Sequence, residues 1–185
     1  MVKALIIIDM IQAYSKDINN DRKIVNNQLK LIKAFQKKKL PVILAVPGRG
    51  IKKMEDNPIS LYLWGNELEG DDKREEGEKL QDLIKELRNI KWDKKIGKPE
   101  YSCFFNTDLE KYCKKKKISE LYICGIYSGC CLHYTGVDAQ YRRIWPILVS
   151  DCSTARGTHK KNCKDFAQMV GKVFTTKEVL QNLHS

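Results

Sequence analysis

Histidine is scarce in this sequence, and the cysteines are not arranged in pairs. Only three histidines occur among the 185 residues, and none precedes His133. The seven cysteines are an odd number, and no two of them are spaced as Cys-x-x-Cys. The sequence therefore indicates neither a disulfide framework nor a four-thiolate zinc site. Because free thiols persist in reducing compartments, we expect an intracellular protein.

Long hydrophobic runs are also missing. The apolar run Ala4–Ile8 is far shorter than a signal peptide, and no segment approaches the ~20 apolar residues that span a membrane. We therefore expect a cytoplasmic protein with no membrane partner.

The chain carries an excess of positive charge, with a formal net charge of +11 and a pI near 9.3. Its lysines occur in short runs where predicted helices end or face solvent, and cations are favourable there. These runs are Lys37–Lys39, Lys114–Lys117 and Lys160–Lys161. No zinc-finger or RNP-type signature accompanies the charge, and aromatic residues are not interleaved with the basic ones. We do not expect a nucleic-acid partner.

Apolar runs and amphipathic segments alternate along the chain. The continuous apolar run Val2–Ile8 is typical of a strand that is buried on both faces of a parallel sheet. The length and the 42% apolar composition suffice for one core, so we expect a single domain over residues 1–185. The pattern predicts an α/β fold: an open, mostly parallel, Rossmann-like sheet of about six strands with helices on both faces.

The expected elements follow from periodicity and from turn residues. The strands are predicted at Val2–Ile8, Val42–Val46, Trp92–Ile96, Glu120–Ile126, Trp145–Ser150 and Val173–Phe174. The helices are predicted at Asp21–Lys39, Glu75–Asn89, Thr107–Lys116 with Thr107 as the cap, Gly129–Arg143, His159–Met169 and Lys177–Leu183. The polar stretch Arg49–Asp72 shows no clear periodicity, and loops of that length are usually lids, binding loops or subunit contacts.

Polar residues that follow the predicted strands are the first candidates for chemistry, because ligands of open α/β sheets bind beyond the carboxyl ends of the strands. Asp9 follows the first strand, and Lys98 follows the third. The segment Ser128–Cys131 follows the fourth.

Cys131 is predicted in the first turn of a helix, where free amides and the helix dipole favour a thiolate. The same amides are suited to an oxyanion. Cysteine is also among the most often buried residues, so a purely structural role stays open. Cys130 is an adjacent alternative nucleophile that the spacing does not exclude.

Histidine does not suit the role of thiol activator here. His133 is two residues from Cys131, and residues at that spacing do not face each other on a helix. Asp9 is a candidate base, because burial at a strand end raises a carboxyl pKa, although such an aspartate often only binds neighbouring amides. Lys98 is a candidate for stabilising both charges, although a lone lysine is most often a solvated loop cation.

Three separated segments, taken together and in order, resemble the isochorismatase-like cysteine hydrolase family, which includes nicotinamidases and N-carbamoylsarcosine amidase. They are Ala4–Met10 with Tyr14 beyond it, Lys98–Leu109, and Gly125–Leu132 continued by Thr135, Asp138–Ala139 and Val149–Asp151. The resemblance implies the isochorismatase-like hydrolase fold, a homo-oligomer and hydrolysis of a small carboxamide or carbamoyl substrate through a cysteine thioester.

The resemblance also implies roles for particular residues. It makes Asp9, Lys98 and Cys131 the catalytic set, which selects Cys131 over Cys130. It implies a cis peptide between Ile126 and Tyr127, and an oxyanion hole formed by the amides of Tyr127 and Cys131.

Two departures from the family pattern bear on the chemistry. Metal-dependent nicotinamidases carry an Asp-x-His pair after the second strand, whereas this chain has Val46–Gly50 there, so we expect no metal and no cofactor. Ile11 stands where the family usually has glutamine. True isochorismatases lack the nucleophilic cysteine, so Cys131 favours hydrolysis of an amide over that of a vinyl ether.

The remaining candidates are pocket residues. Tyr14, Trp64, Phe104 and Tyr127 are suited to walls around a small planar substrate, although Phe104 is equally suited to the core. Arg156 is a candidate for a substrate carboxylate, with a surface arginine as the alternative. The rival functions are a non-catalytic small-molecule-binding or regulatory module on the same fold and a phosphorylated receiver-like domain.

Overall fold

The computed structural model describes residues 1–20, 22–48 and 82–184. The predicted loop at 49–72, with its pocket candidate Trp64, lies outside the described residues. So do residues 75–81 of the helix predicted at 75–89.

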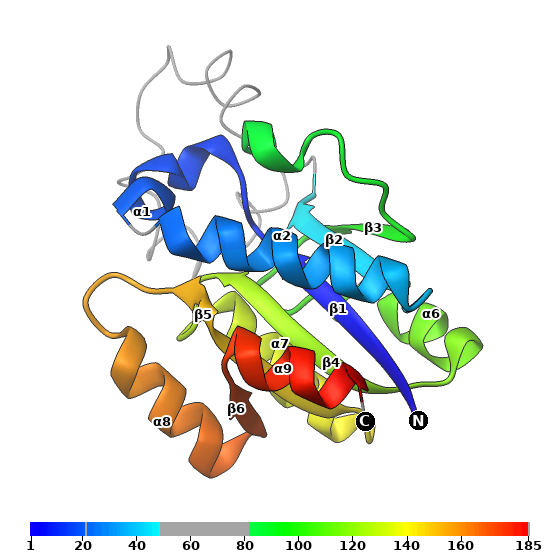
Figure 1. The fold of residues 1–185 in the computed structure, drawn as a ribbon. Coiled ribbons are helices and arrows are strands. Elements are labelled where there is room, and N and C mark those ends of the chain that lie inside the picture. The colour runs from blue at the N-terminus through cyan, green and yellow to red at the C-terminus, as the bar shows by residue number, and fades with distance from the viewer. Residues whose placement is uncertain (21, 49–81, 185) are drawn as a thin grey trace.

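The described chain forms a six-stranded sheet in the order β3-β2-β1-β4-β5-β6, and every pair of neighbouring strands is parallel (Figure 1). The strands are β1 (Val2–Ile8), β2 (Val42–Pro47), β3 (Lys94–Lys98), β4 (Ile118–Ile126), β5 (Trp145–Thr154) and β6 (Lys172–Phe174). The helices are α1 (Ser15–Asn20), α2 (Arg22–Lys37), α6 (Leu109–Lys116), α7 (Cys131–Tyr141), α8 (His159–Met169) and α9 (Thr176–His184).

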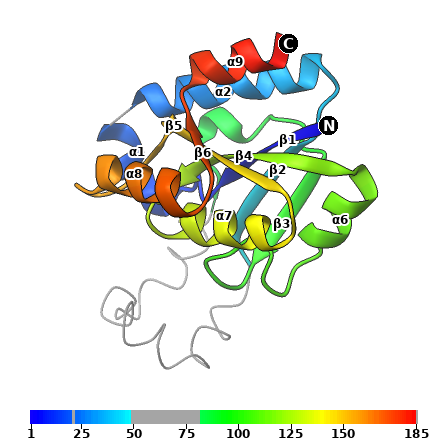
Figure 2. The same cartoon turned by 90° about the horizontal axis from the view of Figure 1, so that it is seen from below.

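Helices cover both faces of the sheet, as Figure 2 shows from below. Side chains of α2 and α9 pack with one set of strand residues, and those of α6, α7 and α8 pack with the other. Alternate residues of β1 serve the two cores: Ile6 and Ile8 face α7, whereas Leu5 and Ile7 face α2. This double burial accounts for the continuous apolar run, and the prediction of an open parallel sheet between helical layers is confirmed.

The prediction of a helix up to Asn89 is wrong in its described part, which contains only a 3-10 turn at Lys85–Leu87. Leu83 instead forms an antiparallel bridge with Ile11, and the amide of Ile84 donates to the carbonyl of Met10 at 3.1 Å. The extended pairing places Ile84 and Leu87 in the core beside α2, so their spacing reflects tertiary contacts rather than a helical stripe.

Other boundaries shift by a few residues. Strand β3 begins at Lys94, two residues after the predicted Trp92, because Asp93 pairs with Val42 instead: its carboxylate accepts from the Val42 amide at 2.9 Å. Strand β5 continues four residues beyond Ser150, through an irregularity in its pairing with β4. None of the helices in the described residues is long and apolar enough to cross a membrane.

The strand order reverses between β1 and β4, and this is where ligands bind in open α/β sheets. At this point Gly125 of β4 pairs with Ile8 of β1. A Cβ atom on Gly125 would lie 2.0 Å from the Ile8 carbonyl oxygen, so only glycine fits there. The close approach brings the loop that follows β4 alongside Asp9.

Candidate active site

Three side chains from three strand ends meet at the carboxyl edge of the sheet. The Nζ atom of Lys98 lies 2.9 Å from Oδ2 of Asp9 and 3.3 Å from Sγ of Cys131. Lys98 ends β3 and reaches across the end of β2, since β2 separates β3 from β1. The three side chains are nearly enclosed, with residue exposures of 2% for Asp9, 7% for Lys98 and 8% for Cys131.

The backbone around Asp9 turns sharply out of the sheet. Its φ is +55°, a left-handed conformation that is uncommon for residues other than glycine. The Asp9 amide still donates to the carbonyl of Ala45 at 2.9 Å, so β1 pairs with β2 up to this residue before the chain turns. The carboxylate therefore points along the sheet edge toward the loop after β4.

Burial and charge act in opposite directions on the Asp9 carboxyl and the Lys98 ammonium. Burial raises the pKa of Asp9, and the nearby Lys98 only partly offsets that rise. Burial alone would lower the pKa of Lys98, but the charges of Asp9 and Cys131 outweigh it and raise that pKa. Lys98 therefore stays protonated, while Asp9 is a stronger base than an ordinary aspartate.

The two adjacent thiols influence each other's ionisation. The hydrogen-bonding effect of Cys130, then burial and the Asp9 charge, raise the pKa of Cys131 against the opposing effect of Lys98. Cys131 is thus a thiol at rest, beside a carboxylate that can accept its proton. The Oδ1 atom of Asp9 is buried without a hydrogen-bond partner among the described residues, so the carboxylate retains an acceptor site.

The loop before Cys131 contains the cis peptide bond between Ile126 and Tyr127. The Tyr127 carbonyl accepts from the amides of Cys130, at 3.0 Å, and Leu132, at 3.3 Å. Within the described chain, neither the Tyr127 amide nor the Cys131 amide donates to a backbone carbonyl.

The Ser128 hydroxyl joins this loop to α8 through contacts that the sequence analysis did not predict. His159 Nδ1 lies 3.0 Å from the Ser128 hydroxyl, and the Asn162 amide donates to that hydroxyl at 3.2 Å. His159 Nε2 lies 2.9 Å from the Ser150 carbonyl oxygen, so Nε2 donates and Nδ1 accepts from Ser128. Ser128 is more than 30 residues from His159 and Asn162 along the chain, so no local pattern predicts these contacts.

Tyr14 and Tyr127 lie together at the site, with ring centroids 5.3 Å apart in an edge-to-face arrangement. Burial, with the charges of Asp9 and Cys131, raises the pKa of Tyr14 to about 12. The Tyr127 hydroxyl donates to Asp17 at 2.5 Å, and Arg156 donates to the same carboxylate oxygen at 3.1 Å. Arg156 thus reaches the rim of the site through Asp17, a residue that the sequence analysis did not single out.

Phe104 is buried in the core shared by α6, α7 and α8, with the guanidinium of Arg142 4.9 Å from its ring centroid. Its neighbours tie the loop after Lys98 to α7. The Ser102 hydroxyl donates to Asp138 at 2.5 Å, and the Cys103 amide donates to Thr135 at 3.1 Å. These bonds give Thr135 and Asp138, both part of the family-like segments, a role in positioning the loop.

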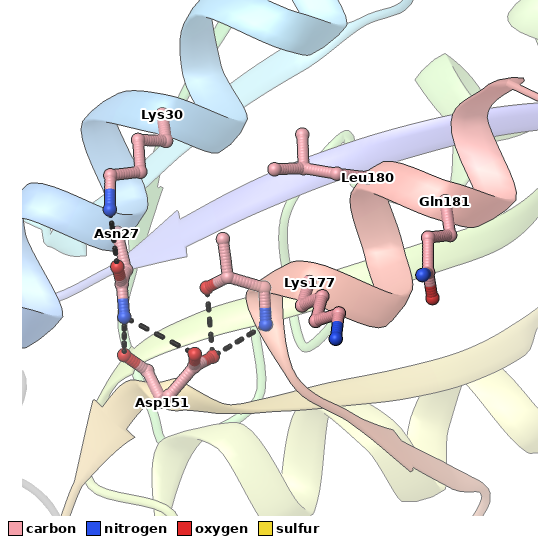
Figure 3. Close-up of a pocket in the computed structure, with 7 residues that line it drawn as sticks. Asn27, Lys30, Asp151, Lys177, Leu180 and Gln181 are labelled. Carbon is pink, nitrogen blue, oxygen red and sulfur yellow. Dashed lines mark hydrogen bonds between the residues drawn. The ribbon is translucent and has the colours of Figure 1, made fainter.

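Asp151 lies away from the three converging side chains, in a pocket between α2 and α9 (Figure 3). Its Oδ1 accepts from the amide and the hydroxyl of Thr176, at 2.7 and 2.8 Å, at the start of α9. Its Oδ2 accepts from Asn27 at 3.2 Å. The carboxylate joins β5 to both helices, which is a structural role.

In residues 1–20, 22–48 and 82–184, no three histidine, cysteine, aspartate or glutamate side chains gather in a group that could hold a metal ion. The charged group that faces the Cys131 sulfur is instead the Lys98 ammonium.

Comparisons with known proteins find related sequences and structures. A sequence model of the isochorismatase domain matches residues 3–178. The ureidoacrylate amidohydrolase RutB of Serratia proteamaculans is 27% identical over 174 residues, covering 83% of this chain and 70% of that protein.

Solved structures show the same fold. A cysteine hydrolase from Pseudomonas syringae pv. phaseolicola superposes with a TM-score of 0.80 at 21% identity, covering 98% of this chain and 92% of the other. N-carbamoylsarcosine amidase from Thermoplasma acidophilum superposes with a TM-score of 0.76 at 25% identity, covering 95% and 97%. Since the domain match runs over nearly the whole chain and the fold agrees, the protein belongs to the isochorismatase family, as the resemblance predicted.

Proposed function

We propose that the protein is a cysteine amidohydrolase that cleaves a small carboxamide or carbamoyl substrate through a thioester on Cys131. The observation that carries the proposal is the position of the Lys98 ammonium, which contacts Asp9 at 2.9 Å and Cys131 at 3.3 Å. A buried cation that contacts both a buried acid and a thiol brings together the groups needed to form and hold a nucleophilic thiolate.

The first step moves one proton. Asp9 accepts the Cys131 proton, and Lys98 stabilises the resulting thiolate and lessens the charge change in the enclosed site. The raised pKa of Asp9 suits this task, because a base with a higher pKa takes the thiol proton more readily.

The second step forms and collapses a tetrahedral adduct. The thiolate attacks the amide carbon, and the oxygen that gains negative charge is bound by the amides of Tyr127 and Cys131. Asp9 then returns its proton to the departing nitrogen, which leaves as ammonia or an amine. Water, deprotonated by Asp9, attacks the thioester, and the acid product leaves with the Cys131 thiol restored.

The nature of the substrate follows from the site walls and from the relatives. Tyr14 and Tyr127, on the segments that follow β1 and β4, form an aromatic edge-to-face pair, which suits a small planar group such as a carboxamide or a urea. The names of the relatives, ureidoacrylate amidohydrolase and N-carbamoylsarcosine amidase, both denote cleavage of an amide bond. A carbamoyl compound is accordingly the first substrate to test.

A hydrolysis screen tests the proposal. Ammonia release is measured with N-carbamoyl amino acids, ureidoacrylate, nicotinamide and simple carboxamides, each with and without a chelator. We expect at least one carbamoyl or carboxamide compound to be turned over, at the same rate with the chelator, because this chain lacks the Asp-x-His pair of the metal-dependent nicotinamidases.

Two outcomes would contradict the proposal. One is hydrolysis of the vinyl ether of isochorismate with no amide turned over. The other is ligand binding, detected as a rise in Tm, without release of any product from any compound, which would indicate a binding module on the same fold.

A further inference from the structure

Two cysteines stand side by side at the mouth of the site, and the proposed reaction uses only one. Cys131 is the first residue of α7, and Cys130 precedes it outside the helix, with φ −130° and ψ −106°. Cys130 is partly exposed, whereas Cys131 is nearly buried. The two residues are consecutive in the chain, and each thiol shifts the pKa of the other, so the two sulfurs belong to one site.

We propose that Cys130 and Cys131 form a reversible oxidation site, in which a hydroperoxide converts the adjacent thiols to a disulfide that blocks the nucleophile. The oxidation is measured on the protein itself, without substrate turnover. Its result is therefore independent of whether the protein has the proposed hydrolase activity.

The surroundings of the pair favour reaction with peroxide. A thiolate is the reactive form, and at this pair it forms more readily on Cys130 than on Cys131, whose pKa is raised although the Lys98 ammonium lies 3.3 Å from its sulfur. The hydrogen bond from Cys131, opposed by burial, lowers the pKa of Cys130. The Cys131 thiol thus favours ionisation of Cys130. Because Cys130 is partly exposed, a small peroxide can reach its sulfur.

The chemistry balances with hydrogen peroxide as the oxidant. The thiolate of either cysteine attacks one peroxide oxygen, the O–O bond breaks, and hydroxide leaves and is protonated to water. The product is a sulfenic acid. The neighbouring sulfur then attacks the oxidised sulfur, the S–O bond breaks, and the thiol proton leaves with the hydroxyl as a second water. The dithiol loses two electrons, and the peroxide gains them.

The sequence spacing makes this disulfide easy to reduce. Adjacent Cα atoms lie about 3.8 Å apart across a trans peptide, below the usual range of about 4.4–6.8 Å for disulfides. Such deviation stores strain and makes the bond more reducible, which is the property of a regulatory rather than a structural disulfide. Because Cys130 lies before the helix, the strain falls at the helix start rather than within it.

The other cysteines compete poorly for the oxidised sulfur. Cys103, Cys124 and Cys152 are fully buried, and burial raises the pKa of Cys103 to about 12. Cys163 is partly exposed like Cys130, but it lies against His159 on α8 at 3.6 Å. Cys163 is therefore the matched control for Cys130.

Peptide mapping after peroxide treatment tests the inference. The folded protein is treated with hydrogen peroxide, its remaining thiols are alkylated, and the tryptic peptide covering residues 118–142 is analysed; this peptide also contains Cys124 as an internal reference. We expect Cys124 to be alkylated and Cys130 and Cys131 to be protected from alkylation. The peptide should then be two hydrogens lighter than the same peptide, alkylated at Cys124, with free thiols at Cys130 and Cys131. Dithiothreitol should restore both thiols.

Two variants distinguish disulfide formation between Cys130 and Cys131 from non-specific oxidation of cysteines. In Cys130→Ser no neighbouring thiol remains, so dimedone should trap a sulfenic acid on Cys131, and excess peroxide should give a sulfinic acid that dithiothreitol does not reverse. Cys163→Ser should behave as the wild type. The inference is overturned if the wild-type pair stays reduced, if wild-type Cys131 proceeds to the sulfinic acid, or if it bonds to Cys163 or Cys103. The wild-type map decides these points even if a variant does not fold.

Discussion

Replacing Cys131 by alanine is expected to lower kcat/KM for the amide substrate by about 10⁴-fold or more, because the variant cannot form a thioester and retains only binding and oxyanion stabilisation. The fold should survive, since the change removes a single sulfur at the start of α7. Initial rates of ammonia release, together with the Tm of each protein, measure both effects.

Cys130→Ala is the matched control, because it removes the neighbouring thiol and leaves Lys98 in contact with both Asp9 and Cys131. It should retain activity within about tenfold of the wild type, as expected for a residue that does not take part in proton or acyl transfer. Normal hydrolysis by Cys131→Ala, with loss of activity in Cys130→Ala, would show that the nucleophile is the other cysteine.

Asp9→Asn is expected to lower kcat by about 10²- to 10⁴-fold, the usual contribution of a general base, because a carboxamide cannot accept the Cys131 proton. The change also leaves the buried Lys98 ammonium without its carboxylate partner. Breaking a buried ion pair from one side costs about 3–5 kcal/mol, so the free energy of unfolding should fall as well. Urea unfolding gives the second quantity, and the kinetics are measured well below the Tm.

Two controls separate the effect of Asp9→Asn on catalysis from its effect on stability: the pH dependence of kcat/KM and the variant Asp151→Asn. Asp9 must be deprotonated to act as the base, so wild-type kcat/KM should fall as the pH drops through its pKa, which burial places above the usual value near 3.9. Asp151→Asn should also lose stability, because Thr176 loses its carboxylate acceptor, but should keep the wild-type kcat and acid limb. An unchanged acid limb in Asp9→Asn would exclude Asp9 as the base.

The site concentrates several unfavourable features at one edge of the sheet. Asp9 has a left-handed backbone, a raised pKa and a buried oxygen with no hydrogen-bond partner in the part of the chain that the structure describes, and Lys98 is a buried cation. A buried ion pair of this kind contributes little to stability compared with apolar side chains of the same volume. Strain and buried charge that cluster in this way are typical of functional sites, which supports a chemical role for the contact between Asp9, Lys98 and Cys131.

Much of the fold could be predicted from the sequence because its strands are buried on both faces. The run Val2–Ile8 has one conformation that satisfies both cores, and the strand observed there has the predicted bounds. The errors fall where neighbours rather than local pattern decide the structure. Lys94–Lys98 is an edge strand with few apolar residues, and the segment around Ile84 pairs with Met10 instead of forming a helix.

The candidate site was predictable in outline only. The rule that ligands bind beyond the strand ends leads to Asp9, Lys98 and the loop before Cys131, but many lysines compete on composition alone. The family-like segments singled out Lys98, and only the structure shows its contact with Asp9 at 2.9 Å. Tertiary partners such as Ser128 and His159, 31 residues apart, leave no trace in local sequence.

The most direct test of the central claim is to look for the acyl group on the sulfur itself. Wild-type protein is mixed with excess substrate, quenched in acid within the first turnovers, and mapped by peptide mass spectrometry. We predict an adduct with the mass of the substrate acyl group on Cys131, absent in Cys131→Ala and accumulating more slowly in Asp9→Asn. Steady turnover with Cys131 unmodified at every time point, or with the acyl group on another residue, would contradict the account.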